Sequence, residues 1–118
     1  MVLRHREREL QLPALLDSGA SLTALPVGAA EFLGFRVEDL ALSDPLITAG
    51  EVLSFKVAVV EHIGVLGCWR RDLAVLVHNF PAPMAQVGIV GLNFLHGLRL
   101  ALDLHENYVE LVDPAAPP

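Results

Sequence analysis

The sequence predicts an all-β fold with one or two short helices. Its apolar residues mostly alternate with polar ones or form short β-branched runs, and glycine or proline separates these runs. Only two short stretches show helical spacing. A chain of 118 residues is near the usual size of one domain, and no linker interrupts it, so we expect residues 1–118 to form a single domain.

The first predicted strand leads into a polar turn. Leu10, Leu12, Ala14 and Leu16 occupy alternating positions. Because Pro13 cannot donate a ladder hydrogen bond, this strand should begin near Pro13 or run along an edge there. An Asp-Ser-Gly-Ala-Ser sequence then turns the chain away from the strand.

One short helix is predicted after this turn. At Pro26–Leu33, proline stands in the first turn, apolar residues recur at roughly helical spacing, and Gly34 ends the helix. The following segment, Val37–Asp44, fits no single type of element.

Apolar runs in the middle of the chain predict further strands. Leu46–Thr48 and Val52–Val60 are separated by Ala49-Gly50-Glu51, which indicates a hairpin with glycine at its tip. Ile63–Gly67 is typical of a strand broken by turns, and Leu73–Val77 of another strand.

The C-terminal third predicts a loop, a strand, a short helix and a hairpin. Asn79–Gln86 contains two prolines and should cross the surface. Val87–Gly91 predicts a short buried strand, and Leu92–His96 one or two helical turns. Leu98–Leu104 and Tyr108–Val112 alternate cleanly and predict a closing hairpin. We expect residues 1–9 and 114–118 to be frayed tails.

Composition limits the partners and the location. The net charge of −6 argues against a nucleic-acid partner, since binding phosphates needs a basic patch. No apolar run is long enough to span a bilayer, and the first ten residues lack the apolar segment of a secretory signal, so we expect a cytoplasmic protein with no membrane partner. A hydrophobic content of 53% is more than one small core readily hides, which favours association with a second copy.

The sequence offers no metal or cofactor site. A single cysteine, Cys68, excludes an intrachain disulfide and a cysteine-based zinc site, and we expect it to be a core or surface residue. The five histidines show no metal-ligand spacing. Ser21 does not lie in a nucleophile elbow, which argues against a serine triad.

Asp17 is the residue most in need of an explanation. It follows the apolar pair Leu15-Leu16, and a carboxylate at the end of a hydrophobic strand carries a desolvation cost. Two interpretations are open. The Asp-Ser-Gly sequence can be an ordinary turn, because all three residues are turn formers, or it can carry catalysis.

Two separated segments resemble the retropepsin-like aspartic proteases. Leu15–Ser21 is similar to the catalytic strand and loop of that family, in which two apolar residues precede Asp, Thr or Ser, Gly and Ala. Ile89–Leu95 is similar to the second signature, in which two apolar residues and a glycine open a short helix. The closing hairpin Leu98–Leu111 resembles that of bacterial and retrotransposon members. The resemblance covers about residues 10–112, and it implies a single-lobe closed β-fold.

The resemblance also implies the chemistry. Aspartic proteases hydrolyse peptide bonds with two carboxylates that share one proton. No second Asp-Ser-Gly or Asp-Thr-Gly follows in this chain, so the second carboxylate would come from an identical subunit. The resemblance therefore implies a homodimeric endopeptidase that acts on peptide or protein substrates, with the two copies of Asp17 meeting at the dimer axis.

Further roles are implied position by position. The Ser18 hydroxyl would hydrogen-bond between the two active-site loops, and Gly19 would let the backbone pass close to the carboxylates. Ala20 would lie beside the substrate, and Gly91 would let the second loop pack behind the first. The hairpin tip would be the flap that closes over the substrate, although Gly50 can equally close an ordinary hairpin; the residues of the tip are Thr48, Ala49, Gly50 and Glu51. The flap departs from the family pattern in having one glycine and a charged residue at its tip.

A second hypothesis keeps the fold and loses the reaction. In that case the domain is a catalytically inactive dimerisation or peptide-binding module of a larger protein. Pepstatin binding and peptide cleavage distinguish the two hypotheses, because an inactive module shows neither.

Overall fold

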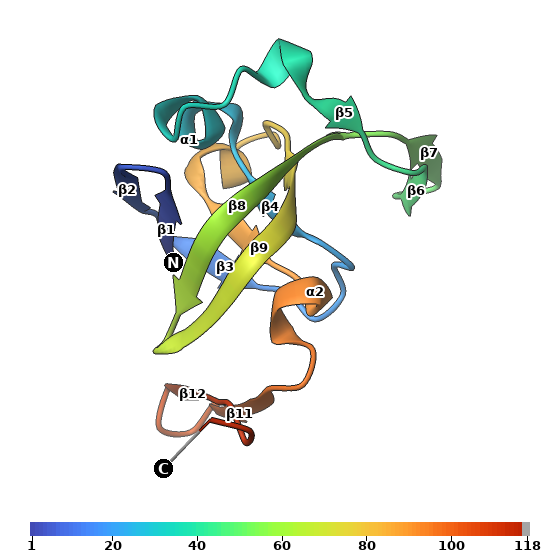
Figure 1. Ribbon diagram of the computed structural model, residues 1–118. Helices are drawn as coiled ribbons and strands as arrows, with labels where there is room; N and C mark the ends of the chain where they lie inside the picture. The colour runs from blue at the N-terminus through green and yellow to red at the C-terminus, as the bar shows by residue number, and fades with distance from the viewer. Residues whose placement is uncertain (117–118) are drawn as a thin grey trace.

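Two long antiparallel strands form the centre of the molecule. In the computed structural model, which describes residues 1–116 apart from the side chain of Thr48, β8 (Lys56–Val65) pairs along its length with β9 (Cys68–Val77) (Figure 1). A two-residue turn joins them, with φ of 49° at Leu66 and 85° at Gly67, as in type I′ hairpins. The break predicted within residues 63–67 is therefore this turn, and β8 is continuous up to it.

The remaining strands of the main sheet flank this pair. The sheet order is β2-β1-β8-β9-β4-β10-β3, and β5 also pairs with β8. The strands not yet given are β1 (Val2–His5), β2 (Arg8–Gln11), β3 (Ala14–Leu16), β4 (Thr23–Leu25), β5 (Ala41–Leu42) and β10 (Gly88–Val90). Because β10 pairs in parallel with β3 and antiparallel with β4, the strand that precedes Asp17 lies at the end of the sheet.

The expectation of a frayed N-terminus over residues 1–9 is wrong. These residues contribute to the β1–β2 hairpin, whose first strand also pairs with β8. The many charges in this segment obscured an apolar pair, since Leu3 lies opposite Leu10 and its side chain is fully buried. Arg4 and Glu9 form the next opposite pair and make a 2.7 Å ion pair on the outer face. At the other end, residues 114–116 follow the last strand as a turn, and residues 117–118 lie outside the described residues.

In the described residues, two short α-helices and two 3₁₀ turns complete the secondary structure. Helix α1 (Val27–Phe32) begins after Pro26, close to the prediction, and α2 is a single turn (Leu92–Leu95). The 3₁₀ turns η1 (Val37–Asp39) and η2 (Met84–Gln86) lie in segments that the sequence left unassigned or read as loop. The predicted all-β class with one or two short helices is confirmed. No helix in the described part of the chain has the length and apolar character needed to cross a membrane.

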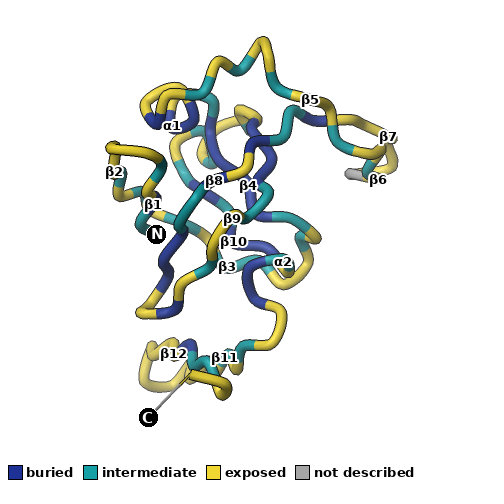
Figure 2. Tube along the Cα trace, viewed as in Figure 1, coloured by how far each residue is buried: buried dark blue, intermediate teal, exposed yellow. Residues whose placement is uncertain are grey.

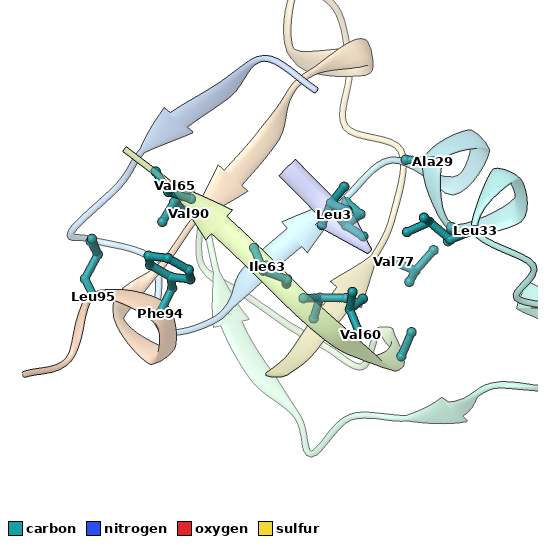
Figure 3. Packing of buried hydrophobic residues seen from close by; sticks show 14 of the residues in the cluster. Leu3, Ala29, Leu33, Val60, Ile63, Val65, Val77, Val90, Phe94 and Leu95 are labelled. Carbon is teal, nitrogen blue, oxygen red and sulfur yellow. The ribbon is translucent and has the colours of Figure 1, made fainter. Parts of the chain in front are cut away.

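The main core lies between α1, α2 and the central strands. Figure 3 shows side chains from β1, β8, β9, β10 and both helices converging on one cluster. Its largest fully buried hydrophobic members are Phe94, Leu3, Leu25, Leu33, Ile63, Val60, Val75 and Val90. A second, smaller cluster is formed by Ala24, Phe55 and Leu76. Phe94 anchors α2 in the core, so the segment that follows β10 is fixed in place.

Two hairpins lie outside the main sheet. One joins β6 (Leu46–Thr48) to β7 (Glu51–Leu53), and the other joins β11 (Arg99–Asp103) to β12 (Tyr108–Val112). They project from different parts of the molecule and consist largely of exposed residues (Figures 1 and 2). The predicted strand over residues 52–60 is in fact two strands, because Ser54 and Phe55 separate β7 from β8.

Candidate active site

The Asp17 carboxylate lies in a tight turn at the end of β3. The Asp17 amide donates a hydrogen bond to the Val90 carbonyl (3.0 Å), which ties the start of the turn to β10. The Asp17 carbonyl accepts a bond from the Ala20 amide (3.1 Å), and carboxylate oxygen Oδ1 accepts one from the Gly19 amide (2.9 Å). The strand, carboxylate and turn expected from the sequence are therefore present, and the side chain is half-buried.

Asp17 opens onto a largely apolar groove. The groove has a volume of about 690 Å³, and its wall combines the Asp17 turn, the smaller hydrophobic cluster and the β6–β7 hairpin. Its lining residues are Asp17, Gly19, Ala20, Ser21, Leu22, Ala24, Pro45, Leu46, Ile47, Ala49, Phe55, Leu76, Phe80 and Ile89. Asp17 is the one carboxylate among these described lining residues. An ordinary turn does not require this placement at an apolar groove.

The β6–β7 hairpin forms one side of the groove. Its two-residue turn has φ of 48° at Ala49 and 81° at Gly50, and Ala49 reaches the groove wall. Gly50 and Glu51 are exposed and are not lining residues. The fourth residue predicted for this tip, Thr48, has a side chain that lies outside the described residues. The hairpin thus brings one of its predicted residues to the groove.

The turn itself contains the other predicted site residues. Gly19 and Ala20 line the groove beside Asp17, whereas Ser18 is exposed and is not a lining residue. A Cβ atom at position 19 would lie 3.2 Å from Asp17 Oδ1, so any side chain there would crowd the carboxylate. The predicted hydrogen-bonding role of Ser18 concerns a partner chain and stays a prediction.

Gly91 lets α2 pack directly behind the Asp17 turn. A Cβ atom at this position would lie 2.5 Å from the carbonyl carbon and oxygen of Leu22, which real Cβ contacts do not reach. The close approach permits two backbone hydrogen bonds. The Leu92 amide donates to the Ala20 carbonyl (2.8 Å), and the Asn93 amide donates to the Ser21 carbonyl (3.1 Å). The packing expected at Gly91 is confirmed.

The sequence analysis missed a buried polar pair that supports this contact. Thr23 is fully buried, and its hydroxyl accepts a bond from the Gly91 amide (3.1 Å) and donates to Asn93 Oδ1 (2.9 Å). Asn93 Oδ1 also accepts a hydrogen bond from the Thr23 amide (2.8 Å), and Asn93 Nδ2 donates one to the Ala74 carbonyl (2.7 Å). The sequence analysis assigned no strand to Thr23–Leu25, so nothing in the sequence indicated that Thr23 is buried. The pair joins β4, β9 and α2 behind the turn.

No metal centre accompanies the groove in the described residues. Nowhere in residues 1–116 do three or more His, Cys, Asp or Glu side chains lie together in a way that could hold a metal ion. Cys68 is buried against β12, where its thiol donates to the Leu111 carbonyl at 3.6 Å.

Comparison with models of known protein families shows to which family the chain belongs. A family model described as aspartyl protease matches residues 6–94. The chain belongs to this aspartyl protease family. The match spans the Asp17 turn, the β6–β7 hairpin and most of α2, and it ends before β11.

A solved structure supports the fold of this aspartyl protease family member. The chain is similar to the crystal structure of a retropepsin-like aspartic protease from Rickettsia conorii, with a TM-score of 0.62 over 95% of this chain and 92% of that one. The sequence identity is 14%, so this likeness bears on the fold, and the predicted retropepsin-like fold is confirmed. A search of curated proteins gave no significant match.

Proposed function

We propose that this aspartyl protease family member is an endopeptidase whose active site forms between two copies of the chain. The observation that carries the proposal is the placement of Asp17, a half-buried carboxylate in the wall of an open apolar groove whose described lining residues include no second carboxylate. Hydrolysis by aspartic chemistry needs two carboxylates, so a second subunit supplies the other. In this proposal residues 1–118 act as one domain.

The proposed reaction uses one carboxylate as base and one as acid. Two carboxylates a few ångströms apart share one proton, because both cannot be ionised at that distance. The ionised Asp17 takes a proton from a water molecule as the water oxygen attacks the peptide carbonyl carbon. The protonated Asp17 of the other copy donates its proton to the carbonyl oxygen. In the breakdown of the tetrahedral intermediate, the Asp17 that took the water proton passes it to the amide nitrogen and the C–N bond breaks. A hydroxyl of the intermediate gives its proton to the other Asp17, which leaves a carboxylic acid, an amine and one shared proton on the pair.

The groove wall suits an extended peptide with apolar side chains. Phe55, Phe80 and Ile89 contribute apolar surface near Asp17, and Ala20 lies on the same wall. In the proposal, the β6–β7 hairpin closes over the peptide through its tip, residues 48–51, and excludes water. Ser18 and Gly19 then hold the Asp17 carboxylate in position.

The β11–β12 hairpin supports association with a second copy. Leu100 and Leu111 are opposite each other, and this pair packs on the main core. The next pair on the same face is Leu102 and Val109, which extends beyond the core and is 63% and 37% exposed. An apolar face that its own chain covers only in part favours association with a second copy of the chain.

The substitution Asp17→Asn tests the proposal. It keeps the size of the side chain but removes the general base, so we expect peptide cleavage at acidic pH to fall about 10²- to 10⁴-fold. Asp44→Asn is the matched control, because Asp44 is exposed and is not a lining residue of the groove. Cleavage that persists at the wild-type rate in Asp17→Asn would exclude the mechanism. A wild-type protein that dimerises but neither cleaves a broad peptide library nor binds pepstatin would instead favour an inactive binding module.

A further inference from the structure

Arg70 joins the central sheet to the end of α2. Its side chain leaves β9 and is half-buried. Nε donates a hydrogen bond to the Phe94 carbonyl at 2.7 Å, and Nη2 donates to the His96 carbonyl. The guanidinium carbon also lies 5.7 Å from the centre of the Phe94 ring. Three separate contacts thus connect one arginine to Phe94 in α2 and to His96, the residue that follows the helix.

These contacts satisfy groups that a one-turn helix leaves open. The last carbonyls of an α-helix have no partner within the helix. In α2 the Leu92 and Leu95 carbonyls accept the amides of His96 and Leu98, whereas the Phe94 carbonyl accepts Arg70 Nε. The planar guanidinium presents N–H groups in a fixed fork, which suits two neighbouring carbonyls better than an ammonium group does. Arg70 therefore fixes the C-terminal end of α2 in place.

The other end of α2 carries the contacts to the Asp17 turn. The amides of Leu92 and Asn93 donate to the carbonyls of Ala20 and Ser21. A single helical turn separates these amides from the carbonyls that Arg70 binds, so movement at one end is transmitted to the other. Beyond His96 the chain turns at Gly97, with φ of 82°, and continues into β11.

We propose that Arg70 is a positioning residue for the reaction. By fixing the C-terminal end of α2, it holds the Asp17 turn in its reactive geometry and sets the direction in which the β11–β12 hairpin leaves the body. This inference rests on the proposed protease function for its catalytic part only. Its structural part, the restraint of α2 against the Asp17 turn, is open to direct measurement.

Amide hydrogen exchange in the full-length chain tests the structural part. We expect Arg70→Ala to speed exchange at Leu92 and Asn93 about tenfold or more, because a hydrogen-bonded restraint on their helix is lost. Arg71→Ala is the matched control, since Arg71 is the next residue of β9, points to the opposite face and is exposed. Exchange in this control should match that of the native protein.

Two results would overturn the inference without reference to protease activity. One is equal exchange at Leu92 and Asn93 in the Arg70→Ala and Arg71→Ala proteins. The other is a rise in exchange rate throughout β8 and β9 that is as large as the rise at Leu92 and Asn93, which would indicate general destabilisation. If Arg70→Ala does not fold, Arg70→Lys keeps the charge but loses the fork. For the inference to stand, the amides of Leu92 and Asn93 must then exchange faster in Arg70→Lys than in Arg71→Lys.

Kinetics test the catalytic part. At protein concentrations where the dimer is complete, we expect Arg70→Ala to lower kcat about 10- to 100-fold, since a small misplacement of reacting groups has effects of this size. KM should change much less, because Phe55, Phe80 and the β6–β7 hairpin, which form the rest of the groove wall, lie outside the segment that Arg70 restrains. Arg70→Lys should recover part of the loss. A KM effect with unchanged kcat would overturn the catalytic part, and a wild-type protein without activity would refute the proposed function but leave the exchange result valid.

Discussion

A missing side chain at Gly91 decides how closely two segments of the candidate active site approach. The residues behind the Asp17 turn make contacts of main chain to main chain, and these leave no room for a Cβ atom. Thr23 and Asn93 add a buried hydrogen-bond network on the far side of the same contact. Each of these residues acts on Asp17 through the backbone, so a change at any of them moves the carboxylate without removing it.

The substitution Gly91→Ala should therefore destabilise the protein. The added methyl group would meet the backbone of Leu22, which cannot rotate away, so we expect a loss of about 1–3 kcal/mol in the free energy of unfolding. Urea denaturation measures this. Gly28→Ala is the control, because Gly28 lies in the first turn of α1 and a Cβ there would meet nothing within 4 Å, so alanine should leave the stability unchanged or raise it slightly. Equal effects of the two substitutions would contradict the close packing assigned to Gly91.

Elements with a regular local sequence pattern were predictable. Elements whose burial depends on distant parts of the chain were not. The α1 helix, the β6–β7 turn and the closing hairpin follow from spacing and turn residues alone. The β1–β2 hairpin did not, because Leu3 and Leu10 are a single apolar pair among charges, and their burial depends on β8, far along the chain. Asp17 and Gly91 were found through motifs. Arg70 carries no local signal, since its partners lie on a different element.

The β8–β9 turn gives a prediction at this scale. Leu66 adopts a left-handed conformation, φ 49°, that costs a residue with a Cβ about 1–2 kcal/mol, and asparagine tolerates it better. We expect Leu66→Asn to raise the free energy of unfolding by about 1 kcal/mol, since Asn-Gly is the preferred type I′ sequence. Thermal denaturation with Leu66→Ala as control tests this. Leu66 is half exposed, so alanine should change little, and an alanine variant as stable as the asparagine variant would exclude the conformational explanation.

For the whole molecule, the proposed interface combines the Asp17 turn, which lines the groove, with the β11–β12 hairpin, which lies outside it. The family match covers the parts that build the groove and ends before the β11–β12 hairpin. The hairpin is joined to the body through Leu100 and Leu111, while the strands carrying Asp17 belong to the main sheet. In the proposed dimer, the two Asp17 turns meet at the axis and the hairpin adds apolar contacts outside the groove, and α2 links the two regions because it contacts the Asp17 turn and leads into β11.

Acid should weaken the whole fold through His5. Burial lowers the pKa of His5, the Glu61 carboxylate raises it by less, and Arg6 lowers it further. The Nδ1 atom of His5 accepts the Glu61 amide at 3.3 Å, and its ring stacks on Phe35. The unfolded chain binds the proton at His5 more readily than the folded chain does. The contribution of His5 to the free energy of unfolding is therefore fully present above about pH 6.5 and is lost as the pH drops from there toward the folded-state pKa.

Urea midpoints measured at a series of pH values test this dependence. The native protein should lose stability between neutral and mildly acidic pH. His5→Gln retains a polar side chain without a titrating group, so its midpoint should vary less over the same interval. If both proteins show the same slope, the dependence arises from other groups.

The single carboxylate in the groove has a genetic consequence. In the proposed enzyme, a chain without the Asp17 carboxylate still folds and associates, so it occupies partners that would otherwise be productive. If a cell made both chains equally and they paired at random, about one quarter of the dimers would carry two carboxylates. An allele that merely destroys the fold would be recessive, whereas an allele that removes only this carboxylate would be dominant.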